Sequence, residues 1–90
     1  MADQITINLI AVNNILRKLK ALEEETRIIL SETDKTISNA ELEGWNDSKY
    51  HVFKDTFYDT KALITGGLKR IDEEHIPYLK KIIRSAEDFN

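Results

Sequence analysis

The chain has 90 residues and a net charge of −3, which is the size of one domain. Hydrophobic residues make up 41% of it and charged residues 32%, too apolar for a disordered tail and too polar for a membrane protein. Because cysteine is absent, disulfides, thiolate metal sites and thiol chemistry are excluded. Neither half of the chain is basic enough to favour a nucleic-acid backbone.

The sequence predicts neither a membrane span nor a cleaved export signal at its start. No run approaches the roughly 18 apolar residues of a membrane helix. Asp3 stands where a signal peptide carries a basic residue, and no clear cleavage site follows. We therefore expect no membrane insertion, and any export must use a route that does not read a cleaved N-terminal signal.

The first arm is predicted to be one helix over about residues 4–42. Apolar side chains recur every three or four residues from Leu9 to Ala40 and form one broad face. Ile5–Leu9 alternates with period two like a short strand, but without a partner strand we interpret it as the frayed start of the helix. Ser31–Asp34 has the pattern of a capping box for a separate helix, yet the periodicity crosses it without glycine or proline, which favours continuity.

A reversal is predicted over residues 43–47. Gly44 supplies a permissive backbone, and Asn46 and Asp47 are good N-cap residues for a second helix. The only tryptophan, Trp45, lies between Gly44 and Asn46. Without any partner protein, the Trp45 ring is expected to pack over the open end of the helix pair.

The second arm is predicted to be a helix over about residues 48–88. Its apolar residues are spaced three or four apart from Tyr50 to Phe89. Glycine lowers helix stability and proline removes a backbone hydrogen bond. The sequence therefore predicts a break near 66–67, at the paired glycines, or a kink near 77, at the proline.

These arms predict an all-α fold, an antiparallel helical hairpin. Two helices leave much of each apolar face without cover, so two hairpins are expected to dimerise into a four-helix bundle; a longer, unlike partner is the alternative. The residues expected in the hairpin or dimer interface are Leu9, Val12, Leu16, Leu19, Ile29, Phe53, Phe57, Ile64, Ile71 and Leu79.

Residues with catalytic or metal-binding chemistry are few. Asp47, His51, Asp55 and Asp59 recur every four residues, but this row drifts around a helix and cannot converge on one ion. His75 falls on the apolar phase and is expected in the bundle interior or at its rim. We predict no metal, no cofactor and no enzymatic activity.

Aromatic residues gather directly after the turn. Tyr50, Phe53 and Phe57 have the spacing of a packed helix face, whereas Tyr58 is out of phase and expected to be exposed. The basic residues near the end of the chain are balanced by acids, so we expect no nucleic-acid or membrane-surface role.

The sequence Gly44-Trp45-Asn46-Asp47 between two amphipathic arms, in a cysteine-free chain near 90 residues, resembles the WXG-type small helical hairpins. These are the early-secreted-antigen-like substrates of type VII secretion. Trp45 matches the family tryptophan, while the third motif position holds Asp47 instead of glycine, as in a divergent Trp-x-Asp branch. The family's Tyr-x-x-x-Asp/Glu export pattern is missing, because Tyr50, Tyr58 and Tyr78 are followed four residues later by Lys54, Ala62 and Ile82.

The resemblance implies a dimeric hairpin that is secreted folded, or that acts as an adaptor or chaperone for a larger effector. Its partner would be a second copy, a paralogue or an effector, with Gly44, Trp45 and Asp47 as turn motif and partner contact. It would be cytoplasmic before export and secreted without a cleaved signal peptide. Two alternatives remain: a cytoplasmic helical adaptor or regulatory subunit unrelated to secretion, and a metal-dependent or histidine-phosphotransfer module using His51 or His75.

Overall fold

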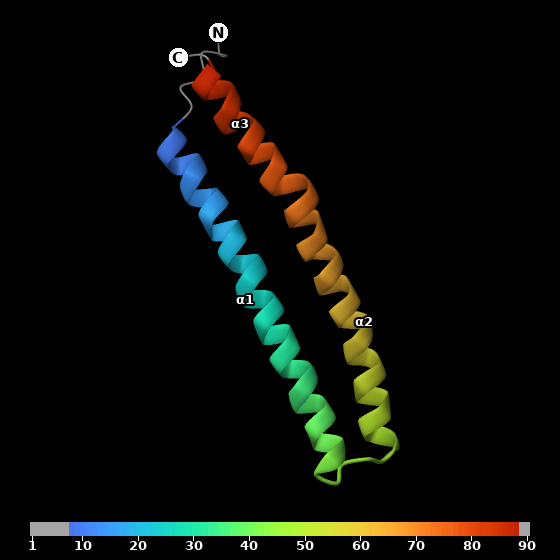
Figure 1. Cartoon of the computed structure of the whole chain (residues 1–90). Helices are drawn as coiled ribbons and strands as arrows, with labels where there is room; N and C mark the ends of the chain where they lie inside the picture. The colour runs from blue at the N-terminus through green and yellow to red at the C-terminus, as the bar shows by residue number, and fades with distance from the viewer. Residues whose placement is uncertain (1–7, 89–90) are drawn as a thin grey trace.

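The computed structural model describes residues 8–88 as two long helical arms lying side by side (Figure 1). The first arm is α1 (Leu9–Leu42); the second consists of α2 (Ser48–Arg70), a π-helical turn, η1 (Ile71–His75), and α3 (Ile76–Asp88). The predicted all-α helical hairpin is confirmed. The predicted helix start near residue 4, the alternating residues 5–7 and Phe89 lie outside the described residues.

Helix α1 runs for 34 residues without interruption. The Asn8 side chain caps its first turn by accepting the backbone N–H of Ala11 at 3.0 Å. The helix passes through Ser31–Asp34, so the capping-box pattern there does not start a separate helix. Without glycine or proline in this stretch, nothing in the backbone opposes continuation.

The reversal after α1 is built on the backbone conformation of Gly44. Its φ of +112° lies in a region that other residues rarely adopt. The N–H of Gly44 donates to the carbonyl of Glu41 at 3.1 Å, and the N–H of Trp45 donates to that of Ala40 at 2.9 Å. This pair of bonds is a Schellman motif, which satisfies carbonyls that the helix end would otherwise leave free.

Helix α2 begins at the cap formed by Asp47, whose carboxylate accepts the N–H of Tyr50 at 2.9 Å. The helix continues through Gly66 and Gly67. Within 4 Å of the position that a Cβ would occupy on either glycine there is no other atom. Packing within the hairpin therefore does not require glycine at these two positions.

The π-helical turn η1 lies directly before Pro77. The N–H of Ile76 donates to the carbonyl of Ile71, five residues back instead of four. In an α-helix the Pro77 ring would clash with the carbonyl of Glu73, and a wider turn relieves that conflict. The extra residue also shifts the helix phase, so that Ile76 is buried between the arms while His75 is exposed.

The hairpin is long and thin, with little interior. Its radius of gyration is 19.9 Å, whereas a compact domain of this length has about 12 Å. Among residues 8–88, the buried apolar side chains are Tyr50, Leu68 and Ile76. No helix in that part of the chain is both long and apolar enough to cross a membrane. Most of the apolar face therefore remains in contact with solvent.

The glycines give a stability prediction. Replacing Gly66 or Gly67 with alanine should raise the free energy of unfolding by up to about 1 kcal/mol each, because alanine favours the helix and space is open. Gly44→Ala is the control and should lower it by about 1 to 2 kcal/mol because of its positive φ. Urea unfolding measures both, and equal effects at the three positions would contradict this assignment.

Candidate functional site

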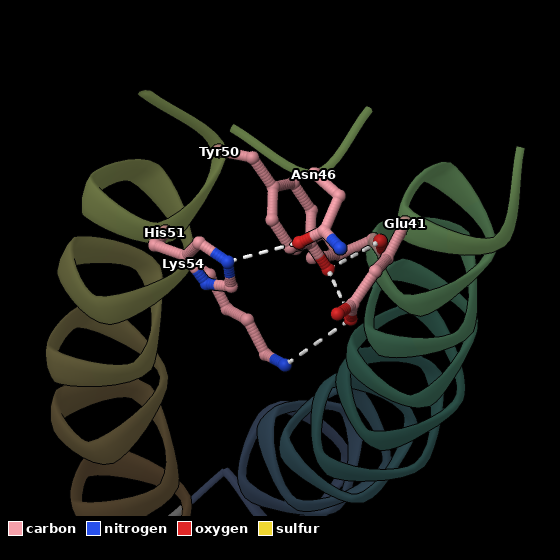
Figure 2. Close-up of polar contacts among 6 residues, drawn as sticks. Glu41, Asn46, Tyr50, His51 and Lys54 are labelled. Carbon is pink, nitrogen blue, oxygen red and sulfur yellow. Dashed lines mark hydrogen bonds and ion pairs between the residues drawn. The ribbon is translucent and has the colours of Figure 1, made fainter. Parts of the chain in front are cut away.

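Tyr50 is the packing centre of the turn end of the hairpin. Its side chain is 0% exposed, and its hydroxyl donates to the carbonyl of Ile37 at 3.0 Å. The same hydroxyl lies 3.4 Å from Oε2 of Glu41 (Figure 2). Burial raises the pKa of Tyr50 above its usual value of 10.0, the Lys54 charge lowers it, and the Glu41 charge raises it. Tyr50 thus ties the start of α2 to the end of α1.

The turn tryptophan packs on this centre without being enclosed. The ring centroid of Trp45 is 5.3 Å from that of Tyr50 in an edge-to-face arrangement, and 6.4 Å from that of Phe53. Trp45 nevertheless stays 45% exposed. The ring therefore covers the end of the helix pair with one part of its surface and leaves the other part accessible.

A polar contact closes the turn beside these rings. Nε2 of His51 lies 2.9 Å from Oδ1 of Asn46 (Figure 2). The His51 ring also packs edge-to-face against Tyr50, with centroids 5.3 Å apart. The contacts with Asn46 and Tyr50 therefore fix the position of the His51 ring at the turn.

Charged residues occupy one edge of the seam between the arms. Lys54 Nζ lies 3.9 Å from Glu41 Oε2, and Lys61 pairs with Asp34. The ammonium groups of both lysines also lie 5.8 and 5.9 Å from the centroid of the Tyr58 ring. We call these five residues the ionic edge. Tyr58 is exposed, and its ring packs against these cations.

Glu23 of α1 is a buried charged residue in the seam between the arms. Glu23 is 6% exposed, and its carboxylate pairs with Arg27 of the same helix at 3.1 Å. Burying a carboxylate is costly unless it is paired. The pair is within one helix, so it contributes little to holding the two arms together.

The opposite edge of the seam is apolar and open. On α1, Ile15, Leu22 and Ile29 follow one another at intervals of seven residues and are 51%, 48% and 61% exposed. Residues seven apart lie on one line of a helix. Asp34 follows Leu22 by twelve residues, which places the ionic edge about 120° further around α1.

The second arm adds to this open side. Ile15 and Leu19 line a shallow groove together with Ile71 and Tyr78 of the other arm, and His75 and Leu79 complete its wall. Phe53 precedes Ile71, the first residue of η1, by eighteen residues, five helical turns, and so lies on the same line of the second arm. We call Ile15, Leu22, Ile29, Phe53 and Tyr78, all exposed, the apolar edge.

The interface residues predicted from the sequence divide into two groups. Ile29 and Phe53 are exposed on the apolar edge, and the others are half-buried between the arms: Leu9, Val12, Leu16, Leu19, Phe57, Ile64, Ile71 and Leu79. Tyr50 was predicted on a packed helix face, and Ile15 and Leu22 belong to the broad apolar face predicted for the first arm, but the interface list contained none of them and not Tyr78. The apolar spacing placed Ile15, Leu22 and Ile29 in one row without showing which side of the seam the row takes.

The structure does not gather Asp47, His51, Asp55 and Asp59 into one group. Asp47 is used as a helix cap and His51 contacts Asn46. Within residues 8–88, no three His, Cys, Asp or Glu side chains come together in a group that could hold a metal ion.

Known proteins do not assign a family to this chain: no protein-family model matches it, and neither the curated proteins nor the solved structures compared with it give a match.

Tyr50→Phe should lower the free energy of unfolding at pH 7 by about 1 kcal/mol, because the hydrogen bond to Ile37 is lost. The raised pKa means that the unfolded chain releases the Tyr50 proton first. Wild-type stability should therefore fall as pH rises through about 10, and the difference from the variant should shrink there. Urea unfolding at pH 7 and above pH 10 measures this; a difference that is constant with pH would contradict it.

Trp45→Ala should lower the free energy of unfolding by about 1 to 2 kcal/mol, since the ring is half-buried and packs on two other rings. Trp45→Phe keeps part of this contact and should lose less. Thermal or urea unfolding of both variants measures the effect. An unchanged unfolding curve for the alanine variant would show that the ring contacts contribute nothing.

Proposed function

We propose that this protein acts by protein association, as a WXG-like helical hairpin that is secreted by a type VII-like system or accompanies its effectors as adaptor or chaperone. The observation that carries the proposal is the apolar edge, whose side chains are all exposed and two of which, Ile15 and Tyr78, line the groove between the arms. Large exposed apolar patches usually mark interaction sites. The partner proposed for it is a second helical hairpin.

One physical argument supports this reading of the apolar edge: a second hairpin laid on it would complete a four-helix bundle, the economical way to cover a helix pair. The link to secretion depends on the likeness of the turn, where Trp45 remains partly accessible between Gly44 and Asp47.

A second candidate function is a cytoplasmic helical adaptor or regulatory subunit unrelated to secretion. The observation that favours it is the sequence after the turn, since no tyrosine there is followed four residues later by an acid. The same apolar edge would then bind a cytosolic protein. Localisation of the chain separates the two functions.

The first experiment is to express the tagged, full-length protein in its source organism and to blot the culture medium and the cell pellet, with a cytosolic enzyme as lysis control. Full-length protein in the medium is expected. Trp45→Ala should reduce the exported amount, whereas Tyr58→Ala, a ring of similar exposure on the ionic edge, should not. Strict retention in the pellet would overturn the export proposal and favour the adaptor.

A further inference from the structure

We propose that the hairpin has a second interaction surface, on the side of the seam away from the apolar edge, which binds an acidic helical segment of a partner protein. This surface lies at the terminal end of the hairpin, the end opposite the turn. We call it the basic face; its residues are Arg17, Lys20, Lys80 and Arg84. Binding there requires neither secretion nor a partner on the apolar edge.

The charges of the chain are segregated along the hairpin. Residues 8–22 and 76–86 together hold six Lys and Arg residues and no Asp or Glu. These two stretches lie side by side at the terminal end (Figure 1). Because the whole chain carries −3, everything outside these two stretches carries −9. The acids that balance the cations in the sequence therefore lie elsewhere along the hairpin.

Lysines of the two arms share the side of the seam away from the apolar edge. Lys20 lies five residues after Ile15, about 140° around α1. Lys80 lies two residues after Tyr78, about 200° around α3. Ile15 and Tyr78 line the groove on the apolar side. Lys20 and Lys80 line a different shallow groove, which also spans both arms. The two arms therefore present these lysines on a common face.

One arginine on each arm extends this face. Arg17 lies three residues before Lys20, and so about one turn from it. Arg84 lies four residues after Lys80, again about one turn away. All four side chains are exposed, and none forms an ion pair with a carboxylate among residues 8–88. The face thus offers four cations that the hairpin itself does not neutralise.

The spacing of these cations matches that of acids on a helix. The pair Lys61–Asp34 gives the register of the two arms. Extended to the terminal end, this register places Arg84 level with about residue 11, so the basic face is about 14 Å long as far as Lys20. Each arm contributes two cations one turn apart. A helix lying along the seam would meet both pairs with acids three or four residues apart on each of its flanks.

Acidic residues bound the basic face at both ends, which limits the length of the partner. Glu24 and Asp72 line the groove next to Lys20. At the other end, Glu87 follows Arg84 by three residues. Duplex nucleic acid carries a charge about every 1.7 Å and would continue over these acids. An anionic membrane would also face the rest of the hairpin, with its charge of −9. A short acidic segment avoids both conflicts.

The test uses the full-length protein and an alanine-rich helical peptide of about 15 residues. The peptide carries two pairs of glutamates, each pair four residues apart, on the two flanks of one face. It should bind about tenfold or more tightly than the same peptide with glutamine, because four exposed ion pairs are added. Raising the salt concentration should weaken binding. Fluorescence anisotropy measures the affinity, and amide chemical shifts in NMR locate the contact.

Charge reversal of the basic face should remove this binding. Lys20→Glu combined with Arg84→Glu should weaken it by about tenfold or more. The matched control, Lys18→Glu combined with Lys81→Glu, makes the same change in net charge and should have a much smaller effect. Lys18 lies about 200° around α1 from Lys20, and Lys81 lies about 200° around α3 from the half-buried Leu79. Circular dichroism confirms that each variant is helical.

Equal binding of the glutamate and glutamine peptides would overturn the inference, as would an equal loss of affinity in the two double variants. Duplex DNA and phosphatidylglycerol vesicles are compared with the peptide in the same buffer. Tighter binding of either one would overturn the acidic segment in favour of a nucleic acid or a membrane surface. A preference for the glutamate peptide that is lost only with the basic face would support the inference.

Discussion

Two helices packed together share only one seam, and the seam of this hairpin is too narrow to enclose the apolar residues of both arms. The helices bury Tyr50, Leu68 and Ile76, while the row Ile15, Leu22 and Ile29 stays in contact with solvent. Folding gains roughly 25 cal/mol for each Å² of apolar surface removed from water. A partner that covers the exposed row would add to that gain, and this constraint is the physical basis of the proposed function in association.

The two edges of the seam differ in what they contribute. The ionic edge joins the arms by the pairs Lys54–Glu41 and Lys61–Asp34. Partly exposed ion pairs of this kind usually contribute less than about 1 kcal/mol each, but they fix which side of the hairpin is polar. The register of the arms is set at the turn, where Tyr50 and the Gly44 reversal hold the helix ends together.

The π-helical turn at Ile71–His75 connects the local sequence with this surface. Pro77 is incompatible with an unbroken α-helix at its position, and one extra residue in the turn resolves the conflict while the helix continues. The same residue rotates α3 and brings Ile76 into the seam. His75 thereby moves to the wall of the open groove.

The sequence by itself determined two helical arms, their reversal at Gly44 and the cap at Asp47, because each depends on local backbone preferences and on apolar spacing. It predicted a broad apolar face but could not say which residues of that face are buried and which are exposed. Only the tertiary structure decided that Glu23 is buried while Ile29 is exposed, since that choice depends on how one helix is rotated against the other. The spacing of apolar residues defines a stripe of apolar side chains along each helix, and the packing between the arms determines which part of that stripe is buried.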